Sequence, residues 1–183
     1  MRVGLFADCH DHLGNLRLAV DAFNRRACQV VLFAGDLVST FAVPPLRRLQ
    51  CPFVGCFGDN EGNRVGLLGG MRIVGRLEEA PVRYESSDGR RFLIVHMLSQ
   101  ARGWQEPVDV LVYGHTHKPM IRRNDAGRLM VNPGETSGWT FGRPTIAVLE
   151  TESMQVELVD LLPRPKSDAA AEPTVPGRAA SGG

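Results

Sequence analysis

The stretch Val110-Leu111-Val112-Tyr113-Gly114-His115-Thr116-His117 decides how the rest of the chain is interpreted. An apolar, β-prone run over residues 108–112 leads into two histidines that stand two positions apart. Along extended backbone this spacing places both imidazoles on one side, and neutral imidazole is the commonest metal-ligating side chain. Gly114 lets the chain turn sharply as it leaves the strand. The alternative is a polar loop that holds two histidines by chance, and the remaining sequence decides between the two.

Length and composition indicate one globular domain. The chain has 183 residues, enough to bury a proper core. Its net charge is +1, so no basic excess points to nucleic acid or to an anionic membrane. No apolar run is long enough to span a bilayer, and residues 1–7 form a strand pattern that meets Asp8 too soon for a signal peptide. We therefore expect a cytoplasmic protein with free thiols at its four cysteines, which are Cys9, Cys28, Cys51 and Cys56.

The order of patterns along the chain predicts the fold class. Residues 16–27 carry apolar positions at helical spacing, with Asn15 as the expected N-cap, and residues 44–49 predict a short helix. The glycine-rich region 62–80 gives no clear pattern. Residues 82–95 and 120–131 predict β-hairpins, and residues 144–159 predict two more antiparallel strands. The apolar runs are nearly continuous, which is typical of strands covered on both faces. We predict an α/β sandwich of two packed mixed β-sheets flanked by helices.

The domain is predicted to occupy residues 1–162. Residues 163–183 consist largely of proline, alanine, glycine and serine with scattered charge. Because this composition cannot bury apolar area, we expect a disordered tail there.

Five apolar runs end in a carboxylate or a histidine. In open α/β sheets, ligands bind at the carboxyl ends of strands, so strand ends from one sheet would bring these side chains together. Four of the five histidines lie at these ends, which scattered core histidines would not do. Seven ligands are too many for one ion, but two divalent ions that share a carboxylate would use them all. The candidate ligands are Asp8, His10, Asp36, Asp59, His96, His115 and His117.

Taken in order, these blocks resemble those of the calcineurin-like metallophosphoesterase superfamily. The blocks are Asp8-x-His10, Gly35-Asp36, Gly58-Asp59-Asn60-Glu61, His96 and Gly114-His115-Thr116-His117. The small, cap-less YfcE-like phosphodiesterase branch is the most similar, through Asp8-Cys9-His10-Asp11-His12 and Asn132-Pro133-Gly134-Glu135. The resemblance covers residues 1–159 and implies the αββα sandwich of that superfamily.

The resemblance also implies roles for these residues. Asp8, His10 and His117 would hold one metal, Asp59, His96 and His115 would hold the second, and Asp36 would bridge. The implied activity is hydrolysis of a small phosphodiester or nucleotide-like substrate by a hydroxide between two divalent metals. Manganese is the expected metal, with nickel, iron, cobalt or zinc as alternatives. The residues expected at the reacting centre are Asp36, Asn60 and His115, and the acceptors expected behind the histidines are Asp11, Glu61 and Asn132.

The third block departs from the family pattern. Asp59 stands where a neutral asparagine ligand is expected, which predicts tighter metal retention and a less acidic bridging water. A slip of one residue would instead make Asn60 the ligand. Many members have a histidine at the position of Asn60 that protonates the leaving group, and without it a factor of about 10²–10⁴ would be missing. His12 could replace that acid, or could be a supporting or surface residue. Met97-Leu98 predicts a more apolar rim.

Other functions remain open from the sequence. The resemblance allows a phosphomonoesterase, or a non-catalytic interaction scaffold like the retromer scaffold subunit. A nuclease is disfavoured because the charge balance provides no stripe of basic residues to follow a phosphate backbone. The resemblance is compatible with a homo-oligomer.

Overall fold

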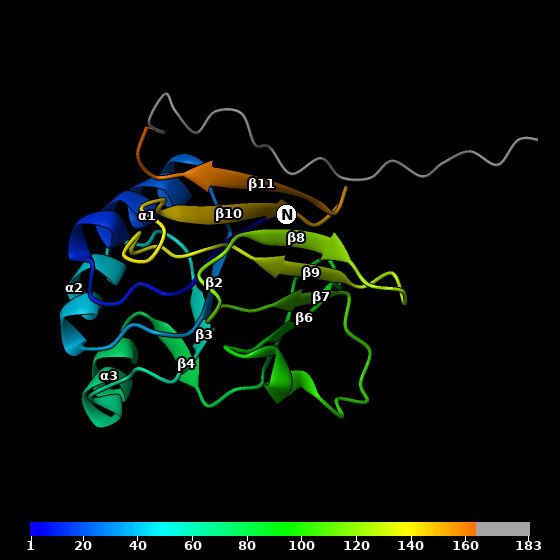
Figure 1. Ribbon diagram of the computed structural model, residues 1–183, viewed down its shortest axis with the longest axis horizontal. Helices are drawn as coiled ribbons and strands as arrows, with labels where there is room; N and C mark the ends of the chain where they lie inside the picture. The colour runs from blue at the N-terminus through cyan, green and yellow to red at the C-terminus, as the bar shows by residue number, and fades with distance from the viewer. Residues whose placement is uncertain (164–183) are drawn as a thin grey trace, which may run out of the picture.

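Two mixed β-sheets pack face to face in the computed structural model, which describes residues 1–163 (Figure 1). The predicted tail lies outside the described residues from position 164 onward. The larger sheet contains, in spatial order, β11 (Gln155–Asp160), β10 (Thr145–Glu150), β1 (Arg2–Phe6), β2 (Val30–Ala34), β3 (Phe53–Cys56) and β4 (Gly75–Glu78). The smaller sheet contains β5 (Val82–Glu85), β6 (Arg91–Ile94), β7 (Val110–Val112), β9 (Leu129–Asn132) and β8 (Met120–Arg123).

The strands that carry the candidate ligands run parallel within each sheet. In the larger sheet β1 pairs in parallel with β2, and β2 with β3. In the smaller sheet β6 pairs in parallel with β7, and β7 with β9. Parallel pairing places the carboxyl ends of neighbouring strands at the same edge of a sheet. Each sheet therefore presents one edge at which the chain leaves several strands together.

The core between the sheets follows from alternation along the strands. In β1 and the residue after it, Val3, Leu5 and Ala7 face the smaller sheet, whereas Phe6 faces the helices. Successive side chains of a strand point to opposite faces, so one short apolar run contributes to both sides. This double burial explains the nearly continuous apolar runs in the sequence.

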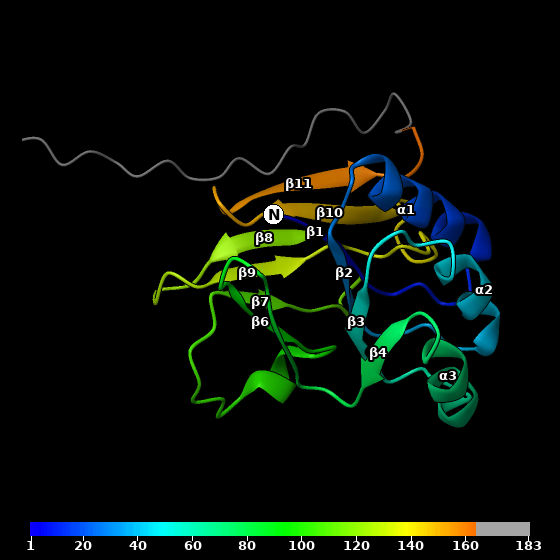
Figure 2. The same cartoon turned by 180° about the vertical axis from the view of Figure 1, so that it is seen from behind.

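The helices pack on the outer face of the larger sheet and gather on one side of the molecule (Figures 1 and 2). They are α1 (Leu13–Arg25), α2 (Val43–Leu46) and α3 (Arg64–Met71). Their apolar side chains meet a group of phenylalanines, including Phe6, Phe33 and Phe53. The outer face of the smaller sheet is covered by the segment that holds Ala101 and Trp104.

The fold class predicted from the sequence is confirmed, as are both hairpins and the antiparallel pair β10–β11. The four cysteines are free thiols, and all but Cys51 are buried. Within residues 1–163 no helix has the length and apolar character needed to cross a membrane. The cytoplasmic location and the homo-oligomer stay predictions.

The structure defines one region that the sequence leaves open and corrects one local expectation. The region 62–80, which shows no clear pattern, contains α3 and β4. Its glycines hide the helix, and Gly70 packs so closely on Val43 that a Cβ there would lie 2.9 Å from a methyl carbon. The expected N-cap Asn15 lies inside α1, where its backbone N–H is one of the groups that needs a cap. Nδ1 of His12 accepts that hydrogen bond at 3.1 Å, so His12 is the N-cap.

Candidate metal centre

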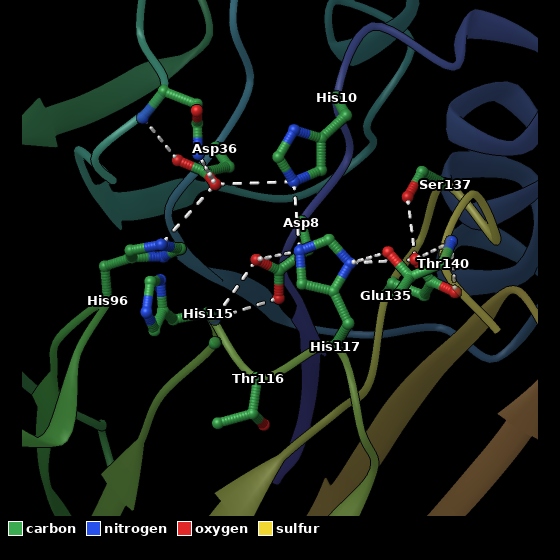
Figure 3. A network of polar contacts seen from close by, with 12 residues as sticks. Asp8, His10, Asp36, His96, His115, Thr116, His117, Glu135, Ser137 and Thr140 are labelled. Carbon is green, nitrogen blue, oxygen red and sulfur yellow. Dashed lines mark hydrogen bonds and ion pairs between the residues drawn. The ribbon is translucent and has the colours of Figure 1, made fainter.

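The seven candidate ligands converge where strand ends of both sheets meet, and Figure 3 labels all of them except Asp59. The larger sheet supplies the residues that follow β1, β2 and β3, and the smaller sheet supplies those that follow β6 and β7. The expectation that one sheet would supply them all is therefore wrong. The two sheets pack with the carboxyl ends of these parallel strands at a common edge, so the site draws on both.

Three overlapping groups of ligand atoms each lie within 4.8 Å of one another. The inner cluster is Asp8, His10 and His117, and the outer cluster is Asp59, His96 and His115. A third group, Asp8, Asp36 and His96, joins the two clusters through Asp36. Oδ2 of Asp36 lies 3.3 Å from Nε2 of His10 and 3.5 Å from Nε2 of His96.

The backbone is strained at most of these residues. Five of the seven candidates have a positive φ, between 43° and 70°, in the left-handed region that ordinary side chains disfavour: Asp8, His10, Asp36, His115 and His117. Each such residue costs of order 1 kcal/mol or more, and such residues concentrate at functional sites. The chain therefore gives up stability to turn these side chains toward one point as each strand ends.

His96 provides a test of whether the site fits a cation. Its Nδ1 lies 2.7 Å from the carbonyl oxygen of Ala34, and because a carbonyl only accepts, Nδ1 carries the proton. In the neutral ring Nε2 then presents its lone pair, and this fully buried atom has no hydrogen-bond partner among the described residues. It faces Oδ1 of Asp59 at 2.7 Å. Two electron-rich atoms at this distance require a proton or a metal ion between them, so the donor set fits a divalent cation.

His117 is oriented in the same way. Its Nδ1 lies 2.8 Å from Oε2 of Glu135, a fully buried residue, and therefore donates its proton to that carboxylate. Nε2 is left to face the cluster, 3.3 Å from Nε2 of His10 and 3.6 Å from Oδ1 of Asp8 (Figure 3). Burial raises the pKa of Glu135, but the hydrogen bonds from His117 and from the backbone of Thr140 outweigh burial and lower it overall.

The two clusters differ in their contact with solvent. Asp8 is fully buried and each of its oxygens accepts the backbone N–H of His115 at 3.1 Å. Burial, and then the charge of Asp36, raises the pKa of Asp8 to about 8, and burial lowers the pKa of His10. In the outer cluster the side chains of Asp59 and His115 are 41% and 45% exposed. Burial raises the pKa of Asp59, but its interactions with the neighbouring imidazoles of His96 and His115 outweigh burial, so the pKa lies below its ordinary value overall.

Asn60 and Glu61 both hold Asp36. The backbone N–H of Asn60 donates to Oδ1 of Asp36 and its side-chain amide donates to Oδ2, both at 2.9 Å. Glu61 accepts the backbone N–H groups of Asp36, Leu37 and Gly58 at 2.9–3.1 Å. Glu61, expected behind a histidine, instead orients the backbone that carries Asp36 and Gly58. Gly58 is needed beside them, because a Cβ there would lie 2.0 Å from Oδ1 of Asp36.

The acceptors expected behind the histidines are placed differently. Asp11 accepts the backbone N–H of Ser39, and Asn132 donates to the carbonyl of Gly114 and thereby supports the turn that carries His115 and His117. Sequence reasoning missed the role of Glu135, which accepts from His117. The available signal was the position of Glu135 at the end of the Asn132-Pro133-Gly134-Glu135 turn, directly after a strand beside β7.

The chain belongs to the calcineurin-like phosphoesterase superfamily, whose domain model matches residues 1–154. A phosphodiesterase of Methanocaldococcus jannaschii is 29% identical over 164 residues, which cover 85% of this chain and 96% of the relative. A solved archaeal phosphodiesterase has 31% identity and a TM-score of 0.80, over 87% of this chain and 99% of the other. The predicted family and its small, cap-less branch are confirmed.

More distant structures share the fold alone. The Escherichia coli phosphoesterase YfcE has 17% identity and a TM-score of 0.65, over 88% of this chain and all of the other. A single mutant of Vps29 from Entamoeba histolytica has 20% identity and a TM-score of 0.61, over 87% of this chain and 99% of the other. Membership of the family makes the protein a metal-dependent phosphoesterase, which implies divalent metal ions and a phosphoester substrate.

Proposed function

We propose that the protein is a phosphodiesterase that hydrolyses small phosphodiesters at two divalent metal ions, with manganese as the expected metal. The observation that carries the proposal is the joining of two ligand clusters through Asp36, beside the buried Nε2 of His96, which has no hydrogen-bond partner among residues 1–163 and faces Asp59. Proteins similar in sequence to this chain are named phosphodiesterases, which supports the diester as substrate.

The residues divide the work between the two ions. The inner cluster would hold one ion, the outer cluster the other, and Asp36 would contribute to both. When bound, such a pair lowers the pKa of a shared water and clamps phosphate oxygens for in-line attack. Asn60 contributes by holding both oxygens of Asp36 with two N–H groups, so the orientation of this carboxylate is set in advance. His115 keeps Asp8 in place through its backbone and contributes its ring to the outer cluster.

Protonation of the leaving group is the step that the side chains of the site support least. The amide of Asn60 has no proton that it can transfer at neutral pH. Nδ1 of His12 caps α1, which ties that ring to a structural role. We therefore expect faster hydrolysis of diesters whose leaving group departs without protonation, such as aryl phosphodiesters.

The test is hydrolysis of bis-p-nitrophenyl phosphate by the metal-free protein, before and after addition of Mn²⁺. Activity should require the metal and should be absent from Asp36→Ala, while Asp21→Asn on the surface of α1 should behave like the wild type. Two bound metal equivalents without hydrolysis would contradict the proposal and favour the non-catalytic scaffold. Faster hydrolysis of p-nitrophenyl phosphate than of the diester would favour a phosphomonoesterase.

A series of aryl diesters tests the missing acid. The rate should rise as the pKa of the leaving phenol falls. A rate independent of that pKa would mean that another group supplies the proton.

A further inference from the structure

An exposed tryptophan stands beside the inner cluster without a role in metal binding. Trp139 is 66% exposed, which is unusual for tryptophan, the residue with the largest side chain. Its only polar atom is already paired, because Nε1–H donates to the carbonyl oxygen of His10 at 3.2 Å. The indole is thus held next to a candidate ligand while much of its apolar surface is left in water.

The position of the indole is fixed from several sides. Its ring lies against the ring of His12, with centroids 4.7 Å apart and planes tilted by 44°. The next two residues, Thr140 and Phe141, donate their backbone N–H groups to the carboxylate of Glu135. Glu135 is the residue that orients His117. The buried carboxylate of Glu135 therefore connects residues 139–141 to His117 of the inner cluster. This connection holds the indole of Trp139 at a fixed position relative to the candidate ligands.

The same rim carries a positive charge. Lys118 follows His117 in the chain, is exposed, and places Nζ 5.1 Å from the centre of the Phe141 ring. A cation and aromatic faces next to a phosphate site are the features that recognise planar groups linked to a phosphate.

We propose that Trp139 is a stacking platform for one ester group of the substrate, a nucleobase or another planar aromatic ring, while the phosphate lies at the two clusters. The inference rests on the proposed function, because it assigns a substrate class to the same site. It makes Trp139 a specificity-determining residue: a diester with a planar ring would bind more tightly than one with only alkyl groups.

The test compares two phosphate monoesters, of which only one carries a base that can stack. Thymidine 5′-monophosphate and methyl phosphate are titrated calorimetrically into the Mn²⁺-loaded protein. Stacking of a base on an aromatic side chain contributes about 5- to 150-fold in affinity. Trp139→Ala should lose that factor for thymidine 5′-monophosphate and keep the wild-type affinity for methyl phosphate. Trp139→Phe, which retains a planar ring, should keep most of the preference, whereas Trp139→Leu, which is apolar but not planar, should lose it.

Metal content and kinetics separate stacking from a structural role. Mn²⁺ stoichiometry should be unchanged in the three variants, and for bis-p-nitrophenyl phosphate Trp139→Ala should raise KM with little change in kcat. If Trp139→Ala disturbs the metal through the backbone of His10, the comparison of Trp139→Phe with Trp139→Leu still decides. Equal affinities of these two variants for thymidine 5′-monophosphate, or an equal loss for both ligands, would overturn the inference.

Failure of the inference and failure of the proposed function give different results. A protein that prefers thymidine 5′-monophosphate through Trp139 but hydrolyses no diester would keep the platform and lose the phosphodiesterase. A protein that hydrolyses bis-p-nitrophenyl phosphate, but in which Trp139→Ala leaves both affinities unchanged, would keep the phosphodiesterase and lose the platform.

Discussion

The inner cluster lies among buried groups that orient it, whereas the outer cluster reaches solvent through two of its three residues. His117 is held by Glu135, and Asp8 by the backbone of His115. In the outer cluster only His96 is held comparably, by the carbonyl of Ala34. Preorganised ligands bind a metal more tightly because less conformational freedom is lost. We therefore expect a tightly bound ion at the inner cluster and an exchangeable ion at the outer cluster.

Substitution of Asp36 is expected to have the largest effect, because it acts on both clusters. It faces both clusters, so Asp36→Asn should reduce kcat/KM for bis-p-nitrophenyl phosphate by about 10³-fold or more and lower the metal content from two equivalents toward one. Elemental analysis and steady-state kinetics measure both. Asp21→Asn, which removes a carboxylate from the surface of α1, is the control. Two retained metals with full activity would mean that Asp36 does not join the clusters.

The pH dependence of metal uptake tests the burial of Asp8. Burial, with the charge of Asp36, raises the pKa of Asp8 to about 8, so below that pH a metal must displace a proton. The affinity of the inner cluster should then rise about tenfold per pH unit, or about 100-fold between pH 6 and pH 8, and level off above. Burial lowers the pKa of His10, which reduces competition between its proton and the metal.

The same shift makes an opposite prediction for the metal-free protein. Folded Asp8 holds its proton more tightly than unfolded Asp8, so the stability it contributes is present below its ordinary pKa of about 4 and declines as the pH rises to about 8. Calorimetric titration with Mn²⁺ and thermal unfolding with a chelator check the two slopes. Metal affinity that is flat from pH 6 to pH 8 would show that Asp8 is ionised before the metal arrives.

Glu135 tests whether bracing distinguishes the clusters. Glu135→Gln keeps the size of the side chain but replaces a carboxylate acceptor by a neutral amide, so the tight class of Mn²⁺ sites should weaken by about 10- to 100-fold. The weak class should remain unchanged. Gln100→Glu is the matched control at the outer cluster. Gln100 accepts the backbone N–H groups of His96 and Met97. Equal weakening of both classes by Glu135→Gln would remove the distinction between inner and outer.

The sequence identified the convergent strand ends better than the framework that aligns them. A buried run that ends in Asp36 or His115 is a local pattern, and local patterns were sufficient to name all seven side chains that the structure brings together. Which sheet each strand joins depends on pairing between distant segments, and so the use of both sheets was missed. Glu135 was not identified as a brace because it lies 18 residues from His117 along the chain, and no spacing rule connects them.

Local rules also failed where packing determines conformation. Helix α3 contains Gly66, Gly69 and Gly70, which disfavour a helix by about 1 kcal/mol each. Contact with α2 outweighs this, because Gly70 lets the two segments approach closely. The cap of α1 was misplaced because His12 is not among the preferred N-cap residues, although its Nδ1 is in position to accept from Asn15.

Asp59 provides the mildest and most specific change to the outer cluster. It carries a charge where the family resemblance expects a neutral asparagine, and its carboxylate lies 2.7 Å from the buried Nε2 of His96. Asp59→Asn would keep an oxygen ligand and remove one negative charge, which should weaken the exchangeable class of Mn²⁺ and make the shared water more acidic. At saturating Mn²⁺ we expect kcat to rise by about a few-fold, because a more acidic water is ionised to a greater extent.

The control for this variant is Asn60→Asp, which adds a charge at the next residue and loses the amide that holds Asp36. It should lower activity, since two carboxylates would then face each other. If Asn60 were the ligand through a slip of one residue, Asp59→Asn would leave metal affinity unchanged. Tighter metal binding by Asp59→Asn than by the wild type would contradict the electrostatic argument, because removal of a negative charge that faces a cation should weaken the binding of that cation.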